Sequence, residues 1–234
     1  MLAVSLMLSV VIPTRNHERR LVPTLASLVP GAADGLVREV IVADGGSTDA
    51  TAEVADLAGC EFLRGAGERG ARLDAAARGA KGPWLLFLEP GVALEDSWRH
   101  EVRKLVDALE RTGEASRRAA TFAFGLDGYD RRSRFGEGAA ALKRLLTGLP
   151  LPEQGLLLHK SFYESLGGFR ALPAMSEADL VRRIGAGRLT RLRSKALAPV
   201  DAVSGAEASG PKGALSAGLL MLRVPPRLVA RLYG

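Results

Sequence analysis

The sequence predicts an α/β fold with a mostly parallel central sheet flanked by helices, and three observations support this. Short apolar runs alternate with stretches of helical spacing along residues 8–88. Runs that are apolar throughout are typical of strands buried on both faces, and their alternation with helices is typical of βαβ units. The composition is 47% hydrophobic and 25% charged over 234 residues. These values fit one soluble globular domain and exclude a disordered chain, a collagen-like fibre and a coiled coil.

Four strands are predicted in the N-terminal part of the chain. They are the largely apolar segments Leu8–Ile12, Glu39–Ala43, Cys60–Leu63 and Trp84–Leu88. Helical spacing predicts helices between them over residues 17–29, 50–58 and 70–79. Pro30 and Gly31 are expected to end the first helix, and Thr48 or Asp49 to cap the second. Because a helix connects each strand to the next, the strands are expected to be parallel.

The C-terminal part alternates less regularly. Helices are predicted over 96–111, Ala139–Leu146, Ser161–Leu166 and Ser176–Ile184, with strands at Thr121–Gly125 and Gly155–His159. Ser176 is expected to cap the last of these helices, whose early acids and final arginines suit the helix dipole. Residues 201–213 are rich in glycine and serine, which predicts a flexible loop. Residues 214–232 form an apolar and basic tail.

The positive charge lies in the C-terminal part of the chain. From Arg188 onward eight basic residues face two acidic ones, which accounts for the whole net charge of +6. Such an end suggests an anionic partner, such as phosphate, a membrane surface or nucleic acid, or else a solvated basic face. Nucleic acid is disfavoured because aromatic residues make up only 5% of the chain and are not interleaved with the basic ones. The single cysteine, Cys60, excludes a disulfide framework and predicts a reducing compartment.

Polar residues follow each of the four N-terminal strands. Ligands of open α/β sheets bind outside the carboxyl ends of the strands, so these positions are the first candidates for a site. The segments are Pro13-Thr14-Arg15-Asn16, Asp44-Gly45-Gly46-Ser47, Arg64-Gly65-Ala66-Gly67 and Glu89-Pro90-Gly91. Together they supply hydroxyls, carboxylates, backbone N–H groups and cations, a set that suits a nucleotide. The alternative is structural, since Asp44 and Thr48 can simply form turns and caps.

A Gly-rich loop offers a second interpretation. Residues 65–70 are a literal G-x-G-x-x-G, from Gly65 to Gly70, between a predicted strand and a predicted helix. Glu89 lies 19 residues past Gly70, where the acidic residue on an NAD ribose would lie. These features suit an NAD-dependent enzyme. Against it, the preceding strand is short and the motif lies outside the first strand–helix unit.

Two segments carry a family resemblance. Ser9–Glu18 holds the pattern Ile-Pro-Thr-x-Asn and Glu39–Asp49 holds Val-x-Asp-Gly-Gly-Ser-Thr-Asp, each at the end of a predicted strand. At this spacing the pair resembles the opening of family 2 glycosyltransferases of GT-A fold, and especially a small bacterial subgroup whose substrates are unassigned. The resemblance implies a GT-A-type nucleotide-diphospho-sugar transferase fold. It also implies transfer of a sugar from a UDP- or GDP-sugar to an acceptor hydroxyl, with inversion.

The resemblance implies an organisation of the chain as well. One domain is expected over residues 1–234, with a nucleotide-binding half at 1–92, an acceptor-side half at 93–200, and the loop and tail at 201–234. The tail can lie on an anionic membrane surface and bring a lipid-linked acceptor close, or it can pack on the sheet as a final helix. The expected location is cytoplasmic, and peripheral at the inner face of the membrane if the tail binds there.

The resemblance assigns roles to individual residues. Glu177 matches the acid that deprotonates the acceptor hydroxyl, as a carboxylate within hydrogen-bond reach can do. Asp179 is the second catalytic candidate, but two positions along a helix it points about 200° away, so Glu177 is favoured. The alternative for Glu177 is a first-turn acid that the helix dipole favours. The donor-binding candidates are Pro13, Thr14, Arg15, Asn16, Asp44, Gly45, Gly46, Ser47, Arg69, Arg72, Glu89, Gly91, Arg132 and Arg134.

The metal motif departs from the family pattern. The family carries Asp-x-Asp after the fourth strand, and its last Asp holds Mn²⁺ or Mg²⁺ on the donor diphosphate. Here Glu89 keeps one carboxylate and Gly91 replaces the last Asp, which leaves a poor anchor for a hard cation. Arginines can neutralise the leaving diphosphate instead, and the candidates are Arg69, Arg72, Arg131, Arg132 and Arg134. Three interpretations stay open: transfer without metal, weak metal binding at Glu89, or a nucleotide-sugar-binding protein that has lost catalysis.

Overall fold

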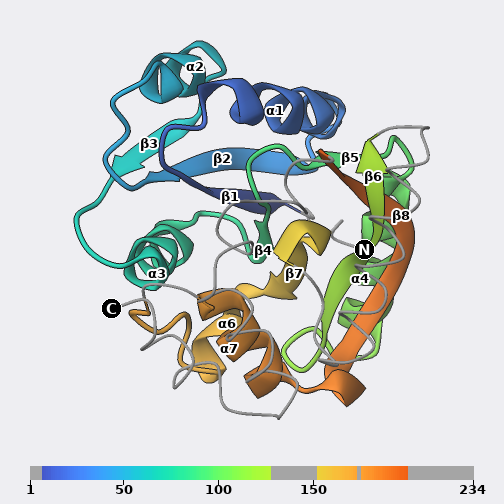
Figure 1. Cartoon of the computed structure of the whole chain (residues 1–234). Coiled ribbons are helices and arrows are strands. Elements are labelled where there is room, and N and C mark those ends of the chain that lie inside the picture. The colour runs from blue at the N-terminus through green and yellow to red at the C-terminus, as the bar shows by residue number, and fades with distance from the viewer. Residues whose placement is uncertain (1–6, 128–151, 173–174, 200–234) are drawn as a thin grey trace.

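An eight-stranded sheet forms the centre of the computed structural model, which describes residues 7–127, 152–172 and 175–199. The strands are β1 (Leu8–Thr14), β2 (Val37–Asp44), β3 (Glu61–Arg64), β4 (Trp84–Phe87), β5 (Ala93–Leu94), β6 (Ala119–Asp127), β7 (Leu156–His159) and β8 (Leu189–Pro199). They lie in the order β3-β2-β1-β4-β7-β6-β8-β5 (Figure 1). β7 is antiparallel to β4 and β6, and β5 to β8, while the other neighbours are parallel. The predicted α/β class with a mostly parallel sheet is confirmed.

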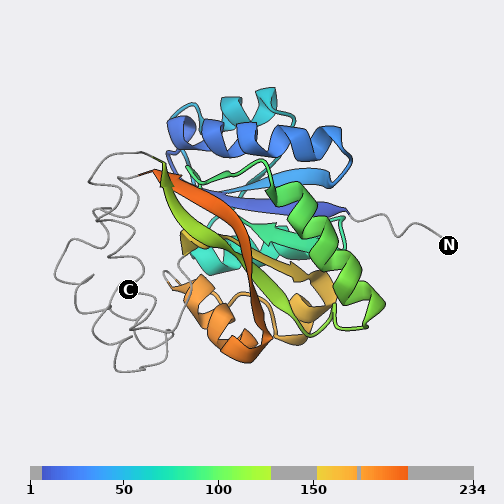
Figure 2. The same cartoon turned by 90° about the vertical axis from the view of Figure 1, so that its right-hand side faces the viewer.

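Helices cover both faces of the sheet. They are α1 (Glu18–Ala33), α2 (Thr51–Leu57), α3 (Arg69–Gly79), α4 (Trp98–Arg111), α6 (Lys160–Ser165) and α7 (Ser176–Ile184), with 3-10 turns at Pro152–Gln154 and Ala186–Arg188. Residues of α1, α2 and α4 pack in one apolar cluster, and residues of α3, α6 and α7 in another. Figures 1 and 2 show α1 and α2 side by side on one face, and Figure 1 shows α3 on the other.

The buried strands explain why the apolar runs could be recognised in the sequence. Val10 and Ile12 of β1 enter one cluster and Val11 enters the other, so consecutive residues of one strand are all buried. The predicted strands and helices therefore match the observed ones within a few residues. The predicted helix Ala139–Leu146, the loop 201–213 and the tail 214–232 lie outside the described residues. Across the described ranges, no helix has the length and apolar character that a membrane span requires.

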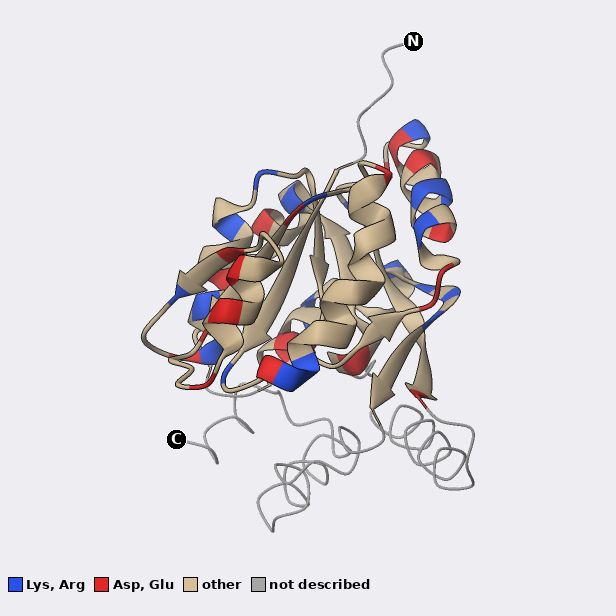
Figure 3. Cartoon of the chain, turned by 90° about the horizontal axis from the view of Figure 1, so that it is seen from above, with Lys and Arg blue, Asp and Glu red and all other residues tan. Residues whose placement is uncertain are grey.

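Strand β8, with eleven residues, was not predicted. Its central positions alternate between the interior and solvent. The buried ones are Leu192, Ser194, Ala196 and Ala198, and the exposed ones are Arg191, Arg193 and Lys195. Part of the basic C-terminal charge is thus the outer face of an amphipathic strand, as the solvated-face interpretation expects. Figure 3 shows acidic and basic positions interspersed over the described elements.

Helix α1 does not end at Pro30 and Gly31 as predicted, but continues to Ala33. Gly35, two residues past that end, has φ 69° and turns the chain so that the Leu36 N–H donates to the Gly31 carbonyl at 2.9 Å. Gly31 serves packing instead, because a Cβ there would lie 2.7 Å from Trp98 Cζ2 of α4. The glycine that looks like a stop signal is therefore the contact point of two helices.

Substituting Gly31→Ala is expected to lower the free energy of unfolding by about 1–3 kcal/mol, because α1 and α4 must separate to make room for a methyl group. Urea unfolding followed by tryptophan fluorescence measures the effect. Gly79→Ala, at the end of α3 with no atom near its Cβ position, is the matched control. The control is expected to be neutral or stabilising by up to about 1 kcal/mol. Equal stability of both variants would contradict the close contact.

Candidate functional site

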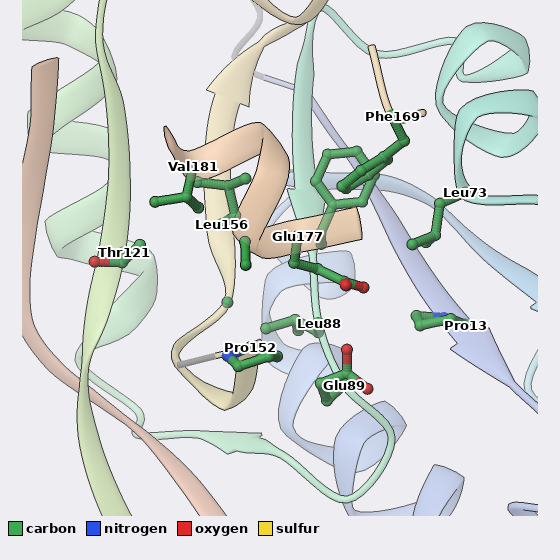
Figure 4. A pocket seen from close by; sticks show the side chains of 13 residues that line it. Pro13, Leu73, Leu88, Glu89, Thr121, Pro152, Leu156, Phe169, Glu177 and Val181 are labelled. Atoms are coloured by element: carbon green, nitrogen blue, oxygen red, sulfur yellow. The ribbon is translucent and has the colours of Figure 1, made fainter. Parts of the chain in front are cut away.

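A pocket opens at the edge of the sheet where the parallel strands β1 and β4 end (Figure 4). Its walls come from distant parts of the sequence and are mostly apolar. They are formed by Pro13, Leu73, Phe87, Leu88, Glu89, Thr121, Pro152, Gly155, Leu156, Phe169, Glu177, Ala178 and Val181. Glu89 and Glu177 are the charged members of this set. The strand-end rule thus leads to the pocket, which three of the predicted site residues line, namely Pro13, Glu89 and Glu177.

Arg69 joins the two pocket carboxylates. Its Nη2 contacts Glu89 Oε1 and also donates to Glu177 Oε1 at 2.8 Å, while its Nε donates to the same Glu177 oxygen at 3.0 Å. The three side chains come from the start of α3, the segment after β4 and the start of α7. Each is only 17–27% exposed. A candidate phosphate-binding cation and two candidate acids therefore form one partly buried ion triad.

Close packing of α3 against the segment before α7 brings this triad together. A Cβ at Gly70 would overlap the carbonyl oxygen of Arg170 and lie 2.6 Å from Ser176 Oγ. The Gly70 N–H donates to the Leu172 carbonyl at 3.2 Å. Ser176 was expected to cap α7, but the cap residue is Met175 at φ 63°, and Ser176 Oγ instead donates to the Leu172 carbonyl. Both the serine and the glycine serve the contact between the two segments.

The electrostatics of Glu89 reflect its crowded position. Burial raises the pKa of Glu89 to about 7. Arg69 opposes this rise, while the carboxylates of Glu177 and Glu153 add to it. Burial and the repulsion of the neighbouring carboxylates outweigh the attraction of Arg69, and together they favour the protonated form of Glu89.

Asp44 organises the loop after β2. It is fully buried, and its Oδ2 accepts the N–H groups of Gly46 and Ser47 at 2.9 Å each. Its Oδ1 accepts from Ser47 Oγ and, at 3.3 Å, from Thr14 Oγ1. Burial alone would raise the pKa of Asp44, but these hydrogen bonds outweigh it and lower the pKa. These contacts are those that the turn-forming interpretation of Asp44 expects. Arg15 and Asn16, on the neighbouring loop after β1, are exposed.

The loops after β1 and β2 are tied to each other. The Asn16 N–H donates to Ser47 Oγ at 2.8 Å, and Asn16 Oδ1 accepts the Thr48 N–H at 2.8 Å. The Gly45 N–H donates to the Thr14 carbonyl at 2.8 Å. Seven of the predicted donor-binding residues therefore lie on one surface formed by the two hydrogen-bonded loops, beside the pocket residue Pro13. We call this surface the ledge; it consists of Thr14 to Asn16 and Asp44 to Ser47.

Asp44→Asn is expected to destabilise the protein by about 1–3 kcal/mol at neutral pH, because the amide nitrogen faces N–H donors that lose their acceptor. Since folding lowers the pKa of Asp44, its contribution is present above the ordinary value of 3.8 and is lost as pH falls through the lower folded pKa. Urea unfolding at pH 7, 5 and 3.5 should show a constant difference between wild type and variant at the two higher values, and a smaller one at the lowest. A difference that grows on acidification would contradict these contacts.

The Gly-rich loop packs around Arg72. Arg72 Nη1 donates to the Gly67 carbonyl at 2.5 Å. A Cβ at Gly45 would lie 2.7 Å from Arg72 Nη2, and one at Gly65 would lie 3.1 Å from Arg72 Cγ. Burial, with the Arg69 cation nearby, lowers the pKa of Arg72. The contacts of Gly65 with Arg72 and of Gly70 with Arg170 account for two motif glycines by packing alone.

The described residues do not fit the divalent-metal site that the resemblance implies. Gly91 has φ 98°, its N–H donates to Thr24 Oγ1 at 2.9 Å, and its Cβ direction is filled by Pro199, 3.2 Å away. Glu89, the remaining carboxylate, is in contact with Arg69. Within the ranges that the structure describes, no three His, Cys, Asp or Glu side chains are grouped as metal ligands.

Asp179 lies away from the pocket. Its Oδ1 accepts from Arg170 Nη1 at 2.9 Å and its Oδ2 from Arg183 Nε at 2.9 Å, and its side chain is 6% exposed. Arg183 also donates to the carbonyls of Leu166 and Gly168. The structure thus brings Glu177 to the pocket and places Asp179 in a buried ion pair. Arg131, Arg132 and Arg134 lie outside the described residues.

Sequence reasoning gave no role to the aromatic residue Phe169, which lines the pocket. Its N–H donates to Tyr163 Oη at 2.8 Å, and Tyr163 Oη donates to Asp74 Oδ1 at 2.7 Å. Its ring lies edge-on to Phe87 with centroids 4.9 Å apart. Asp74 and Tyr163 are 89 positions apart, so no local pattern reports their contact.

Comparisons with known proteins place these features in context. The model of a protein family described as "Glycosyl transferase family 2" matches residues 9–154. Glucosyl-3-phosphoglycerate synthase from Mycobacterium tuberculosis, solved with Mn²⁺, UDP and glucosyl-3-phosphoglycerate, superimposes with a TM-score of 0.59 and 22% identity over 94% of this chain and 81% of that one. S. aureus TarS, residues 1–349, superimposes with a TM-score of 0.57 and 16% identity over 93% of this chain and 64% of that one. No curated protein matches the sequence significantly.

Proposed function

This chain belongs to glycosyl transferase family 2 and has the GT-A fold, and from that premise we propose that it is an inverting enzyme that uses a UDP- or GDP-sugar. The acceptor is a hydroxyl group. The pocket beside the ledge of the loops after β1 and β2 is the site proposed for the reaction, because donor candidates and a candidate base meet there.

The position of Glu177 supports this reaction most directly. It is a carboxylate on the wall of a largely apolar pocket, at the N-terminal end of α7. The acceptor oxygen attacks the anomeric carbon while its proton passes to Glu177. The bond between that carbon and the diphosphate oxygen breaks, and the nucleoside diphosphate leaves with the electron pair. A single displacement of this kind inverts the anomeric carbon.

The donor side is proposed at the ledge. The exposed side chains of Arg15 and Asn16, the turn at Gly45 to Ser47, and the cations Arg69 and Arg72 offer stacking, hydrogen-bonding and phosphate-binding groups in one place. The M. tuberculosis synthase, which shares the fold, has been solved with UDP-glucose and phosphoglyceric acid. Asp44 acts here by shaping the turn, since its carboxylate is fully buried.

The acceptor is proposed to carry its hydroxyl on an apolar group. The pocket walls around Glu177 include Leu73, Phe169 and Val181, while its charged wall groups are both acidic. A lipid-linked acceptor matches this lining better than an anionic one. The basic residues from Arg188 onward fit a cytoplasmic enzyme at the inner membrane face, with the tail 214–232 as the contact.

Calorimetric titration with UDP, GDP, UDP-glucose, UDP-GlcNAc, GDP-mannose and NAD tests the donor class. We expect a uridine or guanosine nucleotide to bind and NAD not to bind. Binding of NAD alone would favour the enzyme suggested by the Gly65–Gly70 motif and contradict the proposal. Because Gly91 removes a metal ligand of the family, a protein that binds the donor without turnover is the second candidate, and a transfer assay separates the two.

A further inference from the structure

We propose that the Arg69 guanidinium, and not a divalent cation, neutralises the donor diphosphate in this protein. The inference rests on the proposed function, since it concerns the same donor site. It follows from the observation that the described residues lack the ligands of the metal site that the family carries.

Arg69 already places a positive charge in direct contact with Glu89. One nitrogen, Nη2, is in contact with Oε1 of both Glu89 and Glu177. A cation held by Glu89 would share that carboxylate with a guanidinium, which stays protonated at every physiological pH. The repulsion between the two cations disfavours the metal, so the positive charge at this point is built into the chain.

The second metal ligand cannot be restored by a small rearrangement. Gly91 occupies the position of the missing Asp, and its φ of 98° disfavours residues with a side chain. Pro199 Cγ and Arg20 Cβ lie 3.2 Å and 3.6 Å from the position that its Cβ would take. A hard cation needs several oxygen ligands, and across the described ranges no three His, Cys, Asp or Glu side chains are grouped to supply them.

The cations around the ledge suit a diphosphate. Burial lowers the pKa of the Arg72 guanidinium, and the nearby cations Arg69 and Arg15 lower it further, against the opposing carboxylates of Asp44 and Glu68. The guanidiniums of Arg15, Arg69 and Arg72 therefore lie close enough together to repel one another. A diphosphate between them relieves that repulsion, and arginine matches phosphate oxygens in pairs. Arg72 is held in place by its bond to the Gly67 carbonyl.

The triad also couples the donor to the base. A phosphate group that accepts hydrogen bonds from Arg69 competes with Glu177 for the same guanidinium. Arrival of the donor therefore loosens the ion pair and leaves the Glu177 carboxylate to accept the proton of the acceptor. The Arg69 guanidinium thereby also determines when the Glu177 carboxylate becomes available as the base.

Calorimetric titration of UDP and GDP into the full chain, once in EDTA and once in MnCl₂, tests the inference. The dissociation constant of the nucleotide that binds should differ by less than about threefold between the two conditions. In EDTA, Arg69→Ala should weaken binding by about tenfold to a hundredfold, the range expected for a lost charged hydrogen bond, and Arg69→Lys by less. Arg78→Ala is the matched control on the same helix, because Arg78 is 53% exposed and pairs with Asp74.

Each outcome is decisive. Binding that requires Mn²⁺, or equal affinity of wild type and Arg69→Ala in EDTA, overturns the inference and leaves the donor class intact. Absence of nucleotide binding in both conditions overturns the donor class and the inference together. If Arg69→Ala does not fold, as circular dichroism would show, the comparison of EDTA with MnCl₂ on the wild type still decides.

Discussion

Replacing Glu177 by Gln is expected to lower the rate of sugar transfer by about 10²–10⁴-fold, the usual contribution of a general base. The amide cannot take up the proton of the acceptor hydroxyl. It keeps the shape of the side chain, and its carbonyl oxygen can still accept from Arg69 as Glu177 Oε1 does at 2.8 Å. Donor affinity and the melting temperature should therefore change little.

Release of nucleoside diphosphate, coupled to formation of the glycosylated acceptor, measures this effect. Glu164→Gln makes the same chemical change at an exposed position of α6 and should leave the rate unchanged. Full activity of Glu177→Gln would exclude Glu177 as the base. A loss of donor affinity with unchanged turnover would instead give it a binding role.

Replacing Asp179 by Ala is expected to lower the free energy of unfolding by about 3–5 kcal/mol, the largest stability effect that we anticipate. The side chains of Asp179 and Arg183 are 6% and 17% exposed, so the arginine would keep a largely buried charge without its carboxylate partner. Arg183 also donates hydrogen bonds to the carbonyls of Leu166 and Gly168, in the segment that leads to the pocket residue Phe169. The pocket should loosen as the helix destabilises.

Glu114→Ala is the matched control for this substitution. It breaks the pair of Glu114 with Arg118, which has the same i,i+4 spacing but side chains 44% and 39% exposed. The control should cost less than about 1 kcal/mol. Urea unfolding of both variants checks the difference. If Asp179→Ala keeps its stability and loses transfer, Asp179 takes part in the chemistry and its structural role is wrong.

The fold could be predicted where local sequence and burial agree. β1 lies between two strands and is covered by helices on both faces, so all of its residues are buried and most of them are apolar, which makes the strand recognisable in the sequence. β8 was missed because its exposed face carries Arg191, Arg193 and Lys195, and these suggested a basic tail. The end of α1 was misplaced because a glycine needed against Trp98 looks the same in sequence as a glycine that ends a helix.

The site could be predicted only up to the edge of the sheet. The strand-end rule selects the positions after β1, β2 and β4, because parallel strands end on one side. Which side chains meet there depends on packing: Arg69 and Glu177 are 108 residues apart and are joined by the contact at Gly70. The complete burial of Asp44 likewise depends on packing that no local sequence pattern reports. The donor and base roles of these residues stay predictions.

A transfer assay with octyl glucoside, whose hydroxyls are linked to an apolar chain, tests the central claim most directly. UDP- and GDP-sugars are supplied in EDTA, and released nucleoside diphosphate and glycosylated product are measured for wild type and Glu177→Gln. We predict that wild type releases nucleoside diphosphate and forms product with inverted anomeric configuration. The Glu177→Gln variant should carry out both far more slowly. Binding of a sugar nucleotide by the wild type without any release, in EDTA or in MnCl₂, would contradict the account and identify a binding protein.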